Sequence, residues 1–240
     1  MQQPFETTFT PDMCSVDFTG RWQPGSVFRA MQEAAGAHCD TLGLSYRALQ
    51  AQGLAWVLSR ARVQMDVYPE LGQPVRVQTW AGATRHLFFP RHYRFYAGGA
   101  EIGRASTLYV LLDIASRKIT LPSRLMRDLP VFDLPAPLSV PGTVRPREAS
   151  QRHDYRPVYT DLDMNGHVNN TRYIDWLMNL IPVEEHARFF VSELLVSYNS
   201  EVVPDEPVRL ELAASGEVRQ LSGWHEDTLC FVAEGHFRAR

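Results

Sequence analysis

Two segments of this chain lie 146 residues apart and share one pattern. A chain that repeats a unit is expected to fold as two copies of one domain. Asp17 and Gly20 align with Asp163 and Gly166. Apolar residues align at the same spacing: Val27, Phe28 and Met31 with Tyr173, Ile174 and Leu177. Aspartate and glycine are the only identities between residues 17 and 24, so chance similarity is the alternative. The sequence predicts a duplication, because the elements around both windows repeat as well.

Each half is predicted to contain one helix and a run of strands. Pro24 suits the first turn of a helix, and apolar residues recur at helical spacing from Val27 to His38, before Gly43. Strand-like runs follow in the first half at 54–67, 75–83, 86–96 and 102–114. The second half has a strand at 153–159, a helix at 170–180 and strands at 189–201, 208–213, 217–224 and 228–237. This order predicts an α+β fold in which each antiparallel sheet carries one helix.

A proline-rich segment separates the halves. Five prolines fall between residues 128 and 146, and proline disfavours both a helix interior and a central strand. We therefore predict an N-terminal domain at 1–130, a semi-extended linker at 131–150 and a C-terminal domain at 151–240.

Composition and charge exclude several classes of protein. The 240 residues carry 24 basic and 27 acidic side chains, a net charge of −3, which gives no global attraction to nucleic acid. The sequence has no apolar run of about 18 residues that could span a membrane, and its N-terminus lacks the pattern of a signal peptide. Cys14, Cys39 and Cys230 form no C-x-x-C pair, so we expect a reduced, cytoplasmic protein.

The densest polar cluster lies at residues 161–170, between a predicted strand and the second helix. A loop that enters a helix N-terminus offers free backbone N–H groups, which could hold an oxyanion. Asp163, Asn165 and His167 place an acceptor, an amide and an imidazole within five residues. Two alternatives stay open. These residues could form the turn and cap the helix, or they could bind a metal, although no second cluster supplies further ligands.

The first-half copy of this loop differs at the two positions that matter most. Thr19 and Arg21 stand where Asn165 and His167 stand in the second half. Any chemistry is therefore predicted to belong to the second half.

The polar loop and parts of the first half resemble one known family. Residues 161–170 read D-L-D-M-N-G-H-V-N-N, with Tyr173 and Trp176 after them; the first half has G-L-A-W-V-L-S-R at 53–60, Thr79-Trp80 and Leu112-Asp113. These residues, in this order, resemble the fatty acyl-ACP thioesterases, which are plant enzymes that end fatty-acid synthesis and their bacterial relatives. The plant enzymes carry a transit peptide; we expect none here and expect the bacterial form.

The resemblance implies two tandem hotdog domains, each a long helix wrapped by an antiparallel sheet. It implies hydrolysis of the thioester between a fatty acyl chain and the phosphopantetheine arm of acyl carrier protein, with no cofactor and no metal. The family's D-x-N-x-H segment falls on Asp163, Asn165 and His167. Its Y-x-x-E-C segment adds Glu201 to the catalytic set and puts Val202 at the position of the cysteine. Water is expected to attack, activated by Glu201 or Asp163, and both stay open as the base.

By the same resemblance, the acyl chain is expected to lie against the first domain. Candidate lining residues are Met31, Trp56 and Leu58, with Ala34 and Ala35; each could instead be plain core. Acyl carrier proteins are acidic, so basic stretches are candidate docking points. These are Arg85-His86, Arg91 to Arg94, Arg117-Lys118 and Arg124 to Arg127. Each stretch could equally be a solvated strand edge.

Three rivals share the expected fold: an acyl-CoA thioesterase, a non-catalytic acyl-binding protein and a dehydratase. The complete set of Asp163, Asn165, His167 and Glu201 argues against the non-catalytic protein. The loop pattern argues against the dehydratase. Acyl chain length and saturation stay open, and so does a homodimer.

Overall fold

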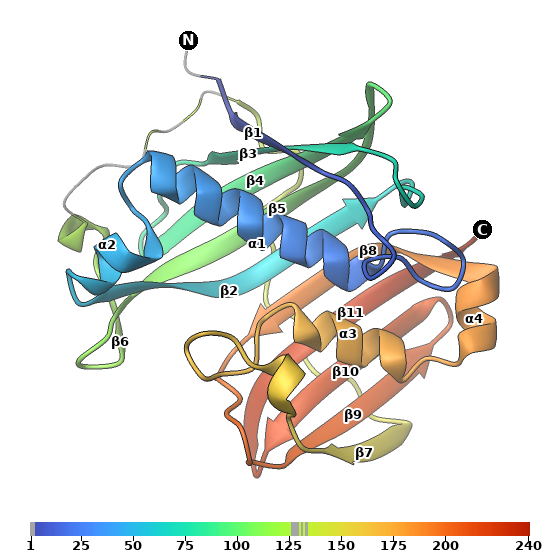
Figure 1. Cartoon of the computed structure of the whole chain (residues 1–240). Coiled ribbons are helices and arrows are strands. Elements are labelled where there is room, and N and C mark those ends of the chain that lie inside the picture. Colours follow the sequence, from blue (N-terminus) through green and yellow to red (C-terminus); the bar gives the residue numbers. More distant parts are fainter. Residues whose placement is uncertain (1–2, 126–129, 131, 133) are drawn as a thin grey trace. The chain divides into compact units, whose positions relative to one another are not determined.

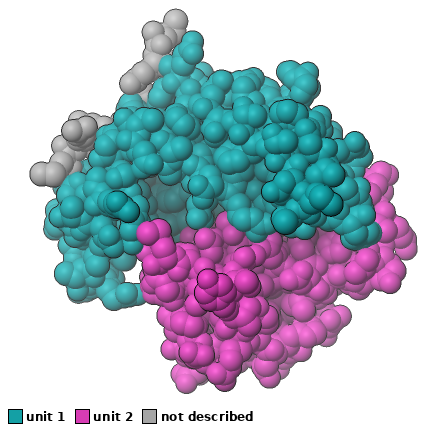
Figure 2. Space-filling view, in the orientation of Figure 1, with its two compact units in different colours: residues 1–141 teal, residues 142–240 magenta. Residues whose placement is uncertain are grey.

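The computed structural model describes residues 3–125, 130, 132 and 134–240 (Figure 1). The chain forms two compact units, unit 1 at residues 1–141 and unit 2 at residues 142–240 (Figure 2). The division falls inside the segment predicted as a linker. No helix in the described part of the chain is long and apolar enough to cross a membrane.

Unit 1 is an antiparallel sheet with one long helix. Its elements are β1 (Phe5–Phe9), α1 (Pro24–Thr41), α2 (Tyr46–Gln50), β2 (Leu54–Met65), β3 (Val75–Ala81), β4 (Phe88–Ala97), β5 (Ala100–Asp113), β6 (Lys118–Thr120) and the 3₁₀ turn η1 (Pro122–Arg124). The strand order is β1-β3-β4-β5-β2, and β6 pairs with β5. Figure 1 shows α1 running across one face of this sheet.

Unit 2 repeats this arrangement with shorter helices. Its elements are β7 (Gln151–Tyr155), the 3₁₀ turn η2 (Tyr159–Asp161), α3 (Arg172–Asn179), α4 (Val183–Arg188), β8 (Phe189–Tyr198), β9 (Val208–Ser215), β10 (Val218–His225) and β11 (Thr228–Ala239). The strand order is β7-β9-β10-β11-β8. When the strands are numbered within each unit, both sheets have the same spatial order: first, third, fourth, fifth and second. This shared order agrees with the predicted duplication.

The two predicted helices are confirmed, with small differences at their ends. Pro24 occupies the first turn of α1, where a missing N–H leaves no hydrogen bond unmade. The helix then buries one face at helical spacing: Val27, Phe28, Met31, Ala34, Ala35 and His38. In unit 2, α3 begins at Arg172, two residues later than predicted, and buries Tyr173, Ile174, Trp176 and Leu177.

The strand predicted at 153–159 is wrong in its second half. β7 ends at Tyr155, and residues 159–161 form the 3₁₀ turn η2. Pro157 has no N–H to give to a strand ladder. The Asp161 carboxylate instead accepts a hydrogen bond from the Val158 N–H at 2.9 Å, which closes the turn. The short elements α2, α4 and β6 have no counterpart among the predicted elements.

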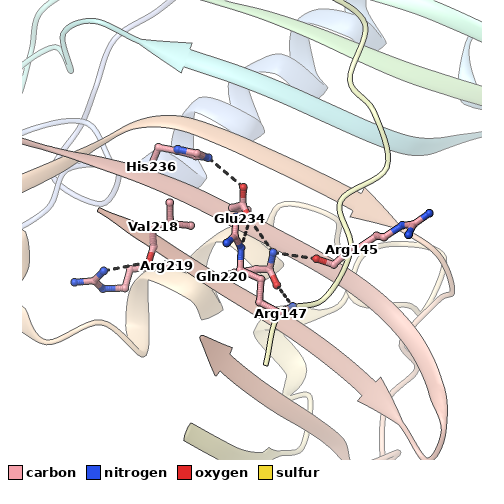
Figure 3. A network of polar contacts seen from close by, with 7 residues as sticks. All are labelled: Arg145, Arg147, Val218, Arg219, Gln220, Glu234 and His236. Carbon is pink, nitrogen blue, oxygen red and sulfur yellow. Dashed lines mark hydrogen bonds and ion pairs between the residues drawn. The ribbon is translucent and has the colours of Figure 1, made fainter. Parts of the chain in front are cut away.

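The segment that leads into β7 is fastened to the unit 2 sheet by polar side chains (Figure 3). Gln220 of β10 accepts a hydrogen bond from the Arg147 N–H (2.6 Å) and donates to the Arg145 carbonyl (3.1 Å). It also donates to the Glu234 carboxylate (2.8 Å), which accepts a second hydrogen bond from Arg147 Nε (2.9 Å). Residues 145–147 are therefore an ordered strap across the sheet, although they form no helix or strand.

Candidate active site

The polar loop of unit 2 folds into a tight turn closed by its own backbone. The Asp163 N–H donates to the His167 carbonyl (2.8 Å), and the Gly166 N–H donates to the Asp163 carbonyl (3.0 Å). Gly166 has a φ of 78°, a left-handed conformation that glycine adopts without steric cost. Leu162 and Val168 pair as a β-bridge on the two sides of the turn. Local hydrogen bonds therefore fix the loop.

Both carboxylate oxygens of Asp163 accept hydrogen bonds from Asn165. Oδ1 accepts from the backbone N–H at 2.8 Å, and Oδ2 accepts from the side-chain Nδ2 at 3.2 Å. Asn165 is exposed and Asp163 is half-buried. This pairing fixes the orientation of an amide at the surface of the turn.

Glu201 lies just beyond the end of β8 and reaches the same turn. The Val168 N–H donates to the Val202 carbonyl at 2.8 Å, which ties the segment after β8 to the polar loop. His167 Nε2 then lies 3.5 Å from Glu201 Oε2. The two side chains are 27% and 38% exposed, so both can meet a substrate from solvent. A carboxylate beside an imidazole is a pair that can hold and move a proton.

A buried aspartate, Asp161, lies just before the turn and links it to β7 and α3. Asp161 accepts hydrogen bonds from the Tyr155 hydroxyl (2.7 Å) and from Trp176 Nε1 (3.2 Å). Burial and the bond to Asp161 raise the pKa of Tyr155 to about 12, so the phenol stays a donor. The repeat and the D-x-N-x-H pattern single out Asp163, but nothing in the sequence indicates that Asp161 is buried. The structure separates them by burial.

Unit 1 contains the same turn with different side chains. The Asp17 N–H donates to the Arg21 carbonyl (2.8 Å), and the Gly20 N–H donates to the Asp17 carbonyl (2.9 Å). Gly20 has a φ of 75°. The Asp17 carboxylate accepts from the Thr19 N–H (2.8 Å) as the Asp163 carboxylate accepts from Asn165. The backbone of the loop is therefore shared, and the imidazole and amide belong to unit 2.

The residues predicted to line an acyl site all belong to unit 1. Met31 is buried on α1, and Leu58 is half-buried on β2. Trp56 is half-buried and packs edge-on against Phe89, with ring centroids 4.8 Å apart. Their burial fits both a lining role and a plain core role.

The basic stretches predicted as docking points divide by burial. Arg85, Arg117 and Lys118 are exposed, and Arg124 is exposed while it pairs with Asp113. Arg127 lies outside the described residues. The stretch from Arg91 to Arg94 is wrong as a docking surface at its first two positions, because Arg91 and His92 are 6% and 5% exposed. Strand residues alternate between the two faces of a sheet, and both faces are covered at this point of β4.

Within the described ranges, no group of three or more histidine, cysteine, aspartate or glutamate side chains could hold a metal ion.

Two family models match this chain. The acyl-ACP thioesterase N-terminal domain matches residues 2–125, and the acyl-ACP thioesterase C-terminal domain matches residues 144–235.

Plant proteins are among the similar sequences. A dodecanoyl-[acyl-carrier-protein] hydrolase, chloroplastic, of Cinnamomum camphora is 26% identical over 80% of this chain and 54% of its own length. A palmitoyl-acyl carrier protein thioesterase, chloroplastic, of Arabidopsis thaliana is 27% identical over 80% of this chain and 50% of its own length. The chain spans about half the length of the curated relatives it matches.

Solved structures share the fold of the chain. An acyl-ACP thioesterase from Bacteroides thetaiotaomicron superimposes with a TM-score of 0.89 at 24% identity, over 97% of both chains. The 12:0-ACP thioesterase from Umbellularia californica gives a TM-score of 0.82 at 22% identity, over 98% of this chain and 97% of that one. The chain thus has the hotdog fold of these proteins. Since the two family models cover most of its residues, the chain belongs to the acyl-ACP thioesterase family.

Proposed function

We propose that the protein hydrolyses the thioester that joins a fatty acyl group to acyl carrier protein, and releases a free fatty acid and the carrier protein. The observation that carries this proposal is the approach of His167 Nε2 to the Glu201 carboxylate, 3.5 Å, beside the Asp163–Asn165 pair. Family membership and the names of the plant relatives support the same substrate class.

In this proposal the two units are tandem hotdog domains with different tasks. The domain at 1–130 receives the acyl chain, the linker at 131–150 connects the domains, and the domain at 151–240 carries the catalytic set. The turn in unit 1 supports this division, because Thr19 and Arg21 replace the amide and the imidazole of unit 2. We also keep the cytoplasmic location as a prediction.

The reaction is a direct attack by water. Glu201 takes a proton from the water as its oxygen bonds to the thioester carbonyl carbon, and the carbon–sulfur bond then breaks. The thiolate that leaves takes up the proton that Glu201 removed from the water. His167 and Asn165 position the water or the substrate and polarise the carbonyl oxygen.

Of the two carboxylates, Glu201 is the better base. Both oxygens of Asp163 already accept hydrogen bonds from Asn165, and Asp17 plays the same part in the turn of unit 1. Asp163 is therefore a positioning residue in this proposal.

The test is hydrolysis of one acyl chain on two carriers. Purified protein and the His167→Ala variant are mixed with the acyl chain on acyl carrier protein and on coenzyme A, and the free acid is measured. We expect release from acyl carrier protein at a higher kcat/KM than from coenzyme A, and loss of both in the variant. Faster turnover of the coenzyme A thioester would replace the proposed substrate with acyl-CoA.

Docking of the acidic carrier would use the exposed basic side chains Arg85, Arg117 and Lys118. Salt screens exposed charges over about 10 Å at 0.1 M. Raising salt should therefore increase KM for acyl carrier protein more than for a small thioester. An Arg85→Glu, Lys118→Glu double variant should show a raised KM for the carrier substrate even at low salt, whereas Arg238→Glu, exposed on β11, should not. An equal salt response for both substrates would exclude these side chains as the docking site.

A further inference from the structure

A buried arginine lies between α1 and the sheet of unit 1. Arg91 projects from β4 and is 6% exposed. Its Nη1 lies 2.9 Å from His38 Nδ1 and 3.2 Å from Thr79 Oγ1, and its Nη2 lies 3.4 Å from Cys39 Sγ. A guanidinium only donates hydrogen bonds, so the Nδ1 of His38 must accept one. His38 is thus held as a neutral imidazole with its proton on Nε2.

The described partners of this guanidinium are all uncharged: an imidazole, a hydroxyl and a thiol. Among the residues that the structure describes, no carboxylate pairs with Arg91. Burial, and then Arg91 itself, lower the pKa of His38 to about 4. Burial raises the pKa of the Cys39 thiol and of the Tyr93 phenol, so both stay protonated at neutral pH. The C-terminal end of α1 supplies a partial negative charge of about 0.5, which offsets only part of the cation.

One edge of the guanidinium meets no oxygen or nitrogen acceptor in the part of the chain that the structure describes. Of its five N–H donors, the two on Nη1 meet His38 and Thr79. Among the described residues, the edge formed by Nε and Nη2 meets only the Cys39 sulfur, a weak acceptor. Such an edge presents two parallel N–H groups, the geometry that binds a carboxylate with two hydrogen bonds.

A second polar side chain, Tyr93, lies beside Arg91. Tyr93 follows Arg91 on the same face of β4 and is fully buried. Its hydroxyl has no hydrogen-bond partner in the described part of the chain. The hydroxyl groups of Tyr109 and Thr107 lie near enough to act on the pKa of Tyr93 as hydrogen-bond partners, although the geometry is not that of a regular hydrogen bond.

The cation borders an apolar cluster of the same unit. The cluster consists of Cys39, Leu44, Leu49, Leu54, Phe89 and Leu111, and Trp56 packs against it. Cys39 touches Arg91, and Phe89 precedes Arg91 on the same face of β4. An alkyl chain held along this cluster would therefore end at a positive charge.

We propose that Arg91, with Tyr93, binds a carboxylate at the far end of the acyl group, so that the preferred substrates are ω-carboxyacyl thioesters. The inference rests on the proposed function, in which unit 1 receives the acyl chain. A buried cation without a counter-charge is costly, and a substrate carboxylate removes that cost while its alkyl part covers apolar surface. Arg91 is then a specificity-determining residue.

The binding test uses two probes of equal length. Monomethyl octanedioate has one carboxylate and one ester, and dimethyl octanedioate has two esters. By calorimetry we expect the native chain to bind the monomethyl ester tenfold or more tightly than the dimethyl ester, as a charge-assisted hydrogen-bonded pair allows. Arg91→Met and Arg91→Gln should abolish the preference. Arg94→Met, three residues further along β4 and so on its other face, should keep it. Equal affinities in the native chain, or a preference that survives both Arg91 variants, would overturn the site.

The kinetic test separates this inference from the proposed function. Octanoyl and ω-carboxyoctanoyl groups are presented on the same acyl carrier protein. We expect kcat/KM to favour the ω-carboxy substrate tenfold or more in the native chain, and the octanoyl substrate in Arg91→Met. Hydrolysis of neither thioester would reject the proposed function, while the binding test would still judge the site. Equal kcat/KM for the two substrates would reject the substrate class assigned to Arg91.

Discussion

Asp163 and Glu201 are both carboxylates beside the polar turn, but they contact different partners. Asp163 accepts two hydrogen bonds from Asn165, and Glu201 lies 3.5 Å from His167 Nε2. If Asp163 stabilises the turn and Glu201 acts as the base, substitutions of the two residues should have different effects on activity and stability.

We expect Glu201→Gln to lower kcat by about 10²–10⁴, the usual contribution of a general base, with little change in Tm because it keeps the shape of the side chain. Asp163→Ala should lower kcat as well, but it should also lower Tm, since the Asn165 N–H and amide lose their acceptor. Steady-state kinetics and thermal unfolding of both variants give the comparison. A fully active Glu201→Gln would move the base to Asp163.

Asp17 is the matched control for Asp163. Asp17→Ala removes the same turn-closing acceptor from unit 1, at a cost of about 1 kcal/mol of stability. We expect its kcat to be largely unchanged, because the turn of unit 1 has no imidazole. If folded Asp17→Ala and Asp163→Ala lost turnover equally, the assignment of chemistry to unit 2 alone would be wrong.

The sequence predicts these residues unequally, for physical reasons. Asp163, Asn165 and His167 fall within one turn whose hydrogen bonds are local, so a short window is enough to group them. Glu201 is far along the chain, and its approach depends on the Val168–Val202 bond, so only the family resemblance indicates it. The charge of Arg91 is visible in the sequence, but the strand face it occupies is set by pairing across the sheet.

Two buried histidines lie at β4: His92 belongs to the strand, and His38 of α1 meets the opposite face through Arg91. Burial, with smaller contributions from nearby arginines, lowers the pKa of His38, which meets Arg91, and of His92 to about 4. In the unfolded chain each pKa is about 6.5. Between these values the unfolded chain binds protons that the folded chain does not, so the free energy of unfolding falls as the pH falls. Above about pH 6.5 neither state is protonated, and the effect vanishes.

We therefore expect the free energy of unfolding to fall from pH 6.5 toward pH 4. Each histidine should contribute up to about 1.4 kcal/mol per pH unit to this decrease. Urea unfolding across this range measures the slope. His38→Gln and His92→Gln should each flatten it, whereas His86→Gln, an exposed position, should not. An unchanged slope in both buried variants would mean that other groups cause the acid sensitivity.

The strap at residues 145–147 depends on one buried amide. Gln220 is 2% exposed and joins Arg147, Arg145 and Glu234 through three hydrogen bonds (Figure 3). Gln220→Ala should cost roughly 2–4 kcal/mol, because buried polar groups lose their partners. Gln151→Ala, exposed on β7, should change stability by less than about 0.5 kcal/mol. Urea unfolding of the two variants decides whether the strap contributes to the stability of unit 2.

Long periodic elements are predictable here, and short ones are not. α1 and the long strands bury a repeating face, which leaves a periodic apolar pattern in the sequence. The 3₁₀ turn η2 depends on the hydrogen bond from the Val158 N–H to the Asp161 carboxylate. This contact produces no periodic pattern of apolar residues in the sequence. The strap is similar: its prolines predict an extended segment, but its fastening to Gln220 depends on the folded sheet.

Across the chain, none of the three thiols is placed for nucleophilic catalysis. Cys14 is exposed in unit 1, and burial raises the pKa of Cys39 and Cys230, which keeps them protonated. By the family resemblance, valine stands at position 202 where the plant enzymes have a cysteine. We expect the variant with all three cysteines changed to alanine to retain most of its kcat. An acyl-cysteine trapped on the native chain, or a folded triple variant without activity, would contradict attack by water.

The turn that carries His167 is present in unit 1 with the same backbone hydrogen bonds and the same left-handed glycine. Many active sites contain strained backbone, and substitutions that raise the activity of such a site often lower the stability of the protein. Here the backbone shape occurs where no reaction is proposed, so it belongs to the scaffold and not to the chemistry. The side chains of Met164, Asn165 and His167 should therefore be replaceable without loss of the turn. In a library randomised at these positions, variants that lose activity should seldom lose expression.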